Sequence, residues 1–255
     1  MTEPRTLRER RDTIAVITLN APERRNAIDL EMVESLHRDL DALQDEKDLG
    51  AVVLTGAGEK AFAAGADIAQ LKERDASDAL KGINSTIFGR IEEFPTPIIA
   101  AVRGFCLGGG CELAIACDLR VGGEGAKFGQ PEVGLGIMPA AGGTYRLPRL
   151  IGLGRARDLV YTGRILEAKE AFDLGLIEKL VPDDQVLQTA IDWAEQIAKN
   201  GPLAVRAAKR SMNALARPNQ AQAGALESSL QASLFESEDK HRRMQAFLDR
   251  KNKKK

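Results

Sequence analysis

The chain has 255 residues, a formal net charge of -1, 44% hydrophobic and 29% charged residues, which is typical of a globular protein and argues against a disordered chain. The near-neutral charge gives no overall attraction to nucleic acid or an anionic membrane, although Arg250–Lys255 is locally basic. We expect a cytoplasmic protein, because the first residues lack the apolar run of a signal peptide and no stretch is long enough to span a bilayer.

Strands and helices alternate in the first part of the chain. β-Branched residues predict a strand at Thr13–Leu19, and Asp29 is a plausible N-cap for a helix whose apolar positions recur three and four residues apart. Further strands are predicted at Ala51–Leu54, Ile98–Val102 and Leu119–Val121, and helices at Ala76–Phe94 and Gly110–Cys117. This alternation predicts an α/β fold with much parallel sheet.

From Gly152 onward strand signals nearly vanish, while helical periodicity continues. The sequence Asn200-Gly201-Pro202 predicts a stop between two of these helices. Their apolar stripes have no evident partner sheet, so they must cover the core, another subunit, or both. We therefore expect a core with the active site at residues 1–195 and a helical oligomerisation region at residues 196–255.

The cysteines and histidines do not indicate a metal site or a disulfide framework. Cys106, Cys111 and Cys117 crowd into one apolar segment without metal-ligand spacing. We interpret them as small core residues in a reducing compartment. His37 and His241 are far apart in the sequence, so we expect no bound metal.

Two glycine-containing segments are candidates for binding a negatively charged oxygen. Gly108, Gly109 and Gly110 open a predicted helix, whose first N–H groups have no partner within the helix. Upstream, Phe62–Asp67 follows a predicted strand and carries almost no bulky side chains, so its N–H groups are accessible as well. The two segments could converge on one carbonyl oxygen as an oxyanion hole.

Two glutamates accompany these segments. Glu112 lies in the first helical turn, where the helix dipole favours its ionised form; the alternative is a surface side chain making a favourable charge contact. Glu132 follows Pro131 in an apolar loop, where desolvation would raise its pKa; the alternative is an exposed loop carboxylate. Two carboxylates in different environments can divide acid and base work. Phosphate-loop, dinucleotide and hydrolase-elbow motifs are absent from the sequence.

Five segments resemble the enoyl-CoA hydratase (crotonase) family, occur in the order found in that family and together span nearly the whole chain. They are Leu19–Ala27, Ala61–Ile68, Gly108–Leu113, Phe128–Glu132 and Pro139–Thr144. The resemblance implies an α/β fold built as a ClpP-like spiral of strand-strand-helix units, with a helical C-terminal trimerisation region. It also implies a homo-oligomer, either a trimer or a hexamer made of two trimers.

The same resemblance implies a reaction on an acyl-CoA thioester. The N–H groups of Ala64 and Gly109 would hold the thioester oxygen of a trans-2-enoyl-CoA. Glu112 would activate water for attack on the β carbon, and Glu132 would supply a proton to the α carbon. Both hydratase glutamates are matched, which favours hydration to a 3-hydroxyacyl-CoA, in fatty acid β-oxidation or related acyl-CoA metabolism, over the scaffold's other reactions.

Coenzyme A would be bound as part of the substrate, and no separate cofactor is expected. The resemblance places its contacts at Ala63, Ala66, Asp67, Ile68, Arg24, Arg25, Phe247 and Arg250, the last two reaching the ligand of a neighbouring subunit. The alternative for the arginines is a solvated side chain, and Asp67 could organise its turn instead.

Three other readings stay open. One is an isomerase, or another enolate-stabilising enzyme on the same scaffold. The second is an RNA-binding relative, against which the 4% aromatic content and the near-neutral charge argue. The third is a non-catalytic assembly protein. The sequence does not specify the length or branching of the acyl group. Its pocket would be formed by Gln70–Phe88 and late helices, and the sequence does not show how these segments pack.

Overall fold

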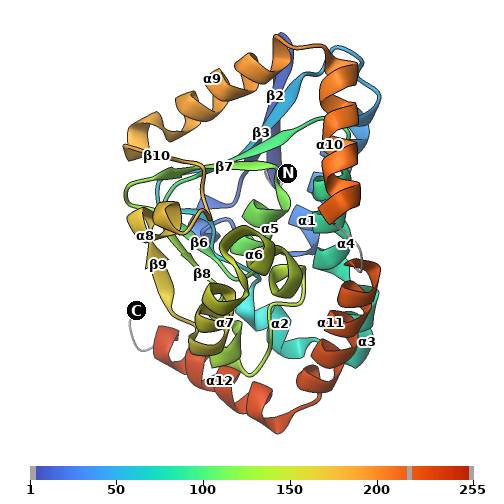
Figure 1. Cartoon of the computed structure of the whole chain (residues 1–255). Helices are drawn as coiled ribbons and strands as arrows, with labels where there is room; N and C mark the ends of the chain where they lie inside the picture. The colour runs from blue at the N-terminus through green and yellow to red at the C-terminus, as the bar shows by residue number, and fades with distance from the viewer. Residues whose placement is uncertain (1–3, 217–219, 253–255) are drawn as a thin grey trace.

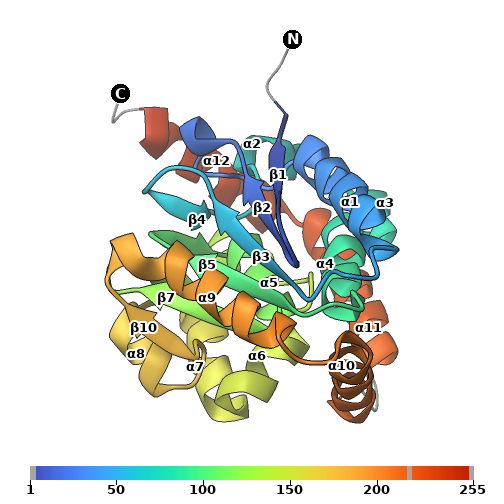
Figure 2. The ribbon, with the colours of Figure 1, turned by 90° about the horizontal axis from the view of Figure 1, so that it is seen from above.

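The computed structural model describes residues 4–216 and 220–252, which fold around two β-sheets (Figures 1 and 2). The larger sheet has the strand order β1 (Thr6–Arg11), β2 (Ile14–Leu19), β3 (Ala51–Gly56), β5 (Ile98–Val102), β7 (Leu119–Gly123) and β10 (Lys179–Val181). The smaller sheet has the order β4 (Ala61–Ala63), β6 (Phe105–Leu107), β8 (Lys127–Gly129) and β9 (Ile165–Glu167). Only the β1–β2 and β8–β9 pairs are antiparallel.

The chain visits the two sheets in turn. Each of β3, β5 and β7 is followed by a short strand of the smaller sheet and then by a helical segment. This is the predicted spiral of strand-strand-helix units, which is confirmed. The sequences of β3 and β5 explain their central positions, because every residue of both strands is buried and most are Val, Ile or Ala.

Helices surround both sheets. They are α1 (Leu30–Gln44), α2 (Ile68–Glu73), α3 (Ala76–Lys81), α4 (Ile83–Glu93), α5 (Gly109–Ala116), α6 (Gly143–Ile151), α7 (Leu153–Thr162), α8 (Ala168–Asp173), α9 (Val186–Ala198), α10 (Pro202–Ala216), α11 (Gln220–Phe235) and α12 (Glu238–Asn252), with 3-10 turns η1 (Pro22–Arg24), η2 (Glu132–Leu135) and η3 (Asp183–Gln185). Helix α5 is buried along its whole length, and α9 packs its apolar side across one face of the larger sheet. None of the described helices is long and apolar enough to cross a membrane.

Local details differ from the sequence prediction. The helix predicted at Ala76–Phe94 is divided into α3 and α4 by Gly82, whose φ of 59° ends the first helix. The region after Gly152 also contributes β9 and β10, which were not predicted. Three residues are too few to show a periodic pattern, and these strands form because an existing sheet edge pairs with them.

The C-terminal helices fold back onto the helices that follow β4. Helix α11 packs against α3, and α12 packs against α2. Lys240 of α12 is fully buried and its Nζ donates to the carbonyl oxygens of Lys72 at 2.7 Å and Arg74 at 2.9 Å. The domain boundary predicted after residue 195 falls within α9, and the helical character of the C-terminal part is confirmed.

Candidate active site

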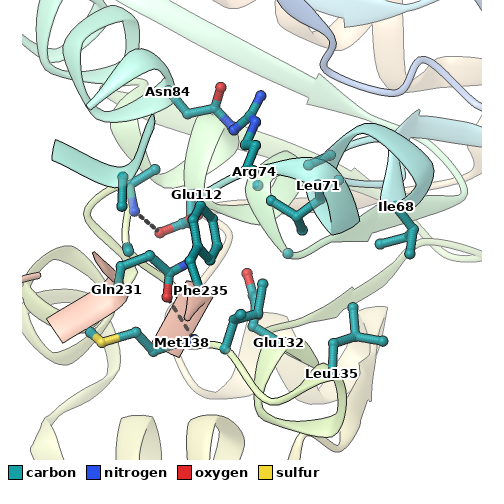
Figure 3. A pocket seen from close by; sticks show the side chains of 18 of the residues that line it. Ile68, Leu71, Arg74, Asn84, Glu112, Glu132, Leu135, Met138, Gln231 and Phe235 are labelled. Atoms are coloured by element: carbon teal, nitrogen blue, oxygen red, sulfur yellow. Dashed lines mark hydrogen bonds between the residues drawn. The ribbon is translucent and has the colours of Figure 1, made fainter. Parts of the chain in front are cut away.

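A cavity of about 370 Å³ lies where α2, α3, α4 and the start of α5 meet η2 and the C-terminal helices. Both predicted catalytic glutamates, Glu112 and Glu132, line it (Figure 3). Gly109 and Ala66 line it as well, and α11 and α12 contribute Phe235 and Phe247. Segments from most of the chain therefore converge on one pocket.

Glycines allow the start of α5 to approach its neighbours closely. Gly108 has a φ of 53°, and a Cβ atom there would lie 3.1 Å from Oε1 of Glu132. A Cβ atom on Gly110 would lie 2.0 Å from the carbonyl oxygen of Ala63, which is an impossible contact. The glycine cluster therefore has two roles, because it seats α5 against β4 and leaves room beside a glutamate.

The structure corrects one of the two predicted oxyanion-hole donors. The Ala64 N–H donates to the carbonyl oxygen of Arg25 at 3.0 Å, so it is already occupied. Gly65, with a φ of 90°, then turns the chain, and the next N–H belongs to Ala66. Within the described residues, the N–H groups of Ala66 and Gly109 have no hydrogen-bond acceptor. A Cβ atom built on Gly109 would lie 3.8 Å from the Ala66 nitrogen, so these two donors are neighbours.

Glu112 is held by the backbone at the start of α6. It is only 3% exposed, and its Oε1 accepts hydrogen bonds from the N–H groups of Ala141 at 2.7 Å and Gly143 at 2.8 Å. Burial raises the pKa of Glu112, while these two hydrogen bonds and the charge of Arg146 oppose the rise. Arg146 is buried too, and it pairs with Glu92 at 2.8 Å.

Glu132 opens η2 and is in a less favourable environment for a charge. Burial and, next, the charge of Glu112 raise the pKa of Glu132 well above its usual value. A terminal amide atom of Gln130 lies 2.9 and 3.2 Å from its two carboxyl oxygens. An amide nitrogen there would suit an ionised Glu132, whereas an amide oxygen would suit a protonated one. The pKa of Glu132 is raised more than that of Glu112. When the pair holds one proton, that proton is therefore favoured on Glu132, and Glu112 is ionised.

A third buried carboxylate, on Glu227 of α11, was not predicted from the sequence. Its Oε2 accepts from the Gly142 N–H at 3.0 Å, and its Oε1 accepts from the N–H of Thr144 at 3.2 Å and from the Thr144 hydroxyl. Glu112 and Glu227 therefore accept hydrogen bonds from alternate N–H groups of the segment Ala141–Thr144. Burial, followed by the charge of Glu112, raises the pKa of Glu227 to about 7. No motif marks this residue, because its role depends on how α11 folds back.

The residues predicted to contact coenzyme A are only partly brought together. Ala66, Ile68 and Phe247 line the cavity, whereas the other five do not. Ala63 is buried in β4, and Arg24 forms ion pairs with Asp29 at 2.8 Å and Asp67 at 2.5 Å. The guanidinium carbon of Arg25 lies 5.4 Å from the centre of the Phe105 ring. The Arg250 Nε donates to the carbonyl oxygen of Ala246. Asp67 also caps α2 by accepting from Ala69 at 2.9 Å and Gln70 at 3.1 Å. In the basic segment Arg250–Lys255, the last three residues lie outside the described residues.

The chain is similar to known proteins along nearly its whole length. The family model of enoyl-CoA hydratase/isomerase matches residues 9–254. The chain is 40% identical over 245 residues to a short-chain-enoyl-CoA hydratase of Clostridium acetobutylicum, covering 95% of this chain and 94% of the relative. It is 38% identical over 243 residues to a 2,3-dehydroadipyl-CoA hydratase of Escherichia coli, covering 95% and 94%. A crystal structure of an enoyl-CoA hydratase from Bacillus anthracis superimposes with a TM-score of 0.81 at 38% identity, covering 96% of each chain.

Proposed function

The chain belongs to the enoyl-CoA hydratase/isomerase family, and from this premise we propose that it adds water across the double bond of a trans-2-enoyl-CoA to give a 3-hydroxyacyl-CoA. The observation that carries the proposal is the pair of buried glutamates, Glu112 and Glu132, in the cavity that also holds two free N–H donors. Hydration needs one group to take a proton from water and one to give a proton to carbon, and the pair supplies both. The relatives described above have hydratase names, which supports the same reaction.

Substrate binding begins at the thioester carbonyl. We place its oxygen between the N–H groups of Ala66 and Gly109, the latter at the positive end of the α5 dipole. These donors stabilise the negative charge that develops on the oxygen when a nucleophile attacks the β carbon. Polarisation of the carbonyl in the ground state also makes that carbon more electrophilic.

The two glutamates then transfer protons. Ionised Glu112 takes a proton from water as the water oxygen bonds to the β carbon, and the electron pair of the double bond moves into the enolate. Protonated Glu132 delivers its proton to the α carbon, which restores the carbonyl. The site then returns to its starting state by moving the proton from Glu112 to Glu132, and the two groups titrate as a pair.

Coenzyme A enters the cavity with its thioester innermost. Ile68 and Phe247 line the pocket and offer apolar surface to the pantetheine arm or the adenine ring. We keep Arg24, Arg25 and Arg250 as candidates for phosphate contacts, although Arg24 would have to share its guanidinium with two carboxylates. In a trimer, or a hexamer of two trimers, Arg250 could reach the ligand of a neighbouring subunit.

Substitution of each glutamate tests the proposal. We expect Glu112→Gln and Glu132→Gln each to lower kcat for hydration by about 10²- to 10⁴-fold. Glu124→Gln, at an exposed glutamate, is the control and should keep the wild-type rate. Near-normal hydration by both active-site variants would refute the assignment.

Product analysis separates hydration from the isomerase alternative. In water enriched in heavy oxygen, a hydratase gives a product that carries the label in its 3-hydroxyl group. An isomerase would move the double bond without incorporating the label. Unlabelled product with a shifted double bond would therefore replace the proposed reaction by isomerisation on the same scaffold.

A further inference from the structure

The cavity has a positively charged side chain, Arg74, that takes no part in the proposed reaction. Arg74 follows the last turn of α2, is half-buried and lines the pocket together with Leu71, Ala79 and Ile83. Its backbone is fixed at both ends, because its N–H donates to Leu71 and its carbonyl oxygen accepts from Lys240. The side chain thus starts from a fixed point and lies in a part of the pocket that Leu71, Ala79 and Ile83 share with two polar residues, Asp78 and Asn84 (Figure 3).

The Arg74 guanidinium has no counter-ion within the described part of the chain. Among those residues it makes neither an ion pair nor a hydrogen bond. The nearby carboxylate of Asp78 is engaged by Lys81 at 2.8 Å and by the Asp75 N–H at 3.3 Å. Burial lowers the pKa of Arg74, and Asp78 only partly opposes this effect. A desolvated cation without a partner is costly, so an anion brought by a ligand would be bound favourably here.

Asn84 connects this cation to the reacting end of the pocket. Its Oδ1 is buried and accepts no hydrogen bond among the described residues. Its Nδ2 lies 3.9 Å from the position of a Cβ atom built on Gly109, next to one oxyanion donor. In Figure 3 the Arg74 guanidinium points toward the Asn84 amide. The pantetheine arm separates the phosphates of coenzyme A from the thioester, so a polar group this close to Gly109 is too near the carbonyl to contact them. We therefore assign Asn84 and the neighbouring Arg74 to the acyl side of the thioester.

We propose that Arg74 and Asn84 form a subsite for a carboxylate at the far end of the acyl chain, so that the enzyme prefers enoyl-CoA substrates with a terminal carboxylate. This rests on the proposed hydratase function. The guanidinium would bind the carboxylate through two N–H donors, and the Asn84 Nδ2 would donate a further hydrogen bond. Another N–H group of the ordered guanidinium could then satisfy the Asn84 Oδ1.

The test compares two substrates that differ only at the chain end. 2,3-Dehydroadipyl-CoA carries a terminal carboxylate where trans-2-hexenoyl-CoA carries a methyl group. For the wild type we expect a higher kcat/KM on the carboxylated substrate. Arg74→Met, which keeps an unbranched stem, should lower kcat/KM on that substrate about ten- to a hundredfold and leave the hexenoyl rate within about threefold. Arg157→Met, at an exposed arginine of α7, is the matched control.

Two further variants extend the comparison. Arg74→Lys keeps a positive charge without the planar fork and should restore part of the preference. Asn84→Ala should lower the carboxylate preference less than Arg74→Met does. If Arg74→Met is poorly folded, Arg74→Lys still tests the proposal, because a partial loss confined to the carboxylated substrate is expected.

Each contrary outcome has a distinct meaning. Equal losses on both substrates would overturn the proposal and assign Arg74 to the phosphates of coenzyme A or to the fold. Unchanged rates on both substrates would also overturn it. Failure of the wild type to hydrate trans-2-hexenoyl-CoA and 2,3-dehydroadipyl-CoA would instead refute the hydratase function, whereas hydration of both with indifference to Arg74 would refute only the subsite.

Discussion

Two alanines beside the proposed oxyanion hole, Ala64 and Ala66, show how a single backbone angle controls which N–H group faces the pocket. Ala64 and Ala66 lie two positions apart, and in a regular strand their N–H groups would point to the same side. Gly65 breaks this relation with its φ of 90°. The Ala64 N–H is consumed by Arg25, while that of Ala66 is free beside Gly109. The sequence predicted that Phe62–Asp67 supplies an oxyanion donor, but it did not identify Ala66 as that donor. The direction of an N–H group depends on the backbone angles, which the residue types alone do not specify.

Gly65→Ala tests the importance of this turn. A Cβ atom at residue 65 would lie 3.0 Å from the Leu107 carbonyl oxygen and would be added at a positive φ, so the segment must shift. Because Ala66 would shift with it, we expect kcat to fall about 10²-fold or more, as for a lost oxyanion-hole donor. Steady-state kinetics would measure the change. Gly89→Ala, where no atom lies within 4 Å of the new Cβ, should leave kcat unchanged, and equal behaviour of the two variants would contradict the assignment.

Glu227 gives a prediction about stability and pH. Its pKa is raised from 4.5 to about 7, so the folded protein holds this proton more tightly than the unfolded chain does. Its contribution to stability is therefore lost as pH rises from 4.5 through 7, by an amount on the order of 3 kcal/mol. Glu227→Gln removes this dependence.

Urea unfolding at several pH values would measure the effect. The free energy of unfolding of the wild type, relative to that of Glu227→Gln, should be highest below pH 4.5 and should fall steadily until about pH 8. Because the charge of Glu112 raises the pKa of Glu227, the difference between the two proteins reports the coupled titration of these two groups. Glu124→Gln is the control, and a difference that stays constant with pH would show that Glu227 does not titrate in this range.

Element by element, the sequence was most informative where the chain forms its buried centre. Asp29 caps α1 by accepting from the Met32 N–H at 2.8 Å, as predicted, and β3, β5 and α5 lie where periodicity placed them. The short strands of the smaller sheet were harder to predict, since they have three residues each and depend on neighbours distant in sequence. The folding back of α11 and α12 could not be predicted from their periodicity, which gives the apolar face but not its partner.

Lys240→Met tests how α12 closes the pocket. The substitution leaves the carbonyl oxygens of Lys72 and Arg74 without their buried donor, which should cost about 1–3 kcal/mol of stability. Because α12 carries Phe247, we also expect the KM for an enoyl-CoA to rise more than kcat falls. Chemical unfolding and steady-state kinetics would measure both. Lys199→Met, at an exposed lysine, should change neither, and an unaltered KM in Lys240→Met would show that α12 does not need this anchor.

At the scale of the whole molecule, the resemblance to a family supplied what local patterns could not. Composition and periodicity predicted an α/β protein with late helices, but the spiral and the meeting of five distant segments came from the resemblance. The late helices were also expected to line the pocket, and the structure identifies Gln231, Phe235 and Phe247 as the residues through which they do so. The region expected to make subunit contacts is therefore also part of the active site, so assembly and activity should be linked.

The outward side of α10 is the surface where we expect this link. Leu203 is 80% exposed, and exposed small residues follow at helical spacing, at Ala204, Ala207, Ala208 and Ser211. This stripe of small side chains, bordered by the exposed Arg210, suits close packing against another subunit. We expect the wild type to be a trimer or hexamer and Ala207→Glu, which places a charge at the centre of the stripe, to shift it toward monomer.

Light scattering coupled to size-exclusion chromatography would measure the mass of each variant. If assembly supports the pocket, hydration by Ala207→Glu should recover as protein concentration is raised, because mass action restores the oligomer. Lys199→Glu also introduces an acidic side chain at an exposed position, but off this stripe, so it should keep the wild-type mass. An Ala207→Glu protein with unchanged mass would exclude this side of α10 as the contact, and a monomeric wild type would refute the proposed assembly itself.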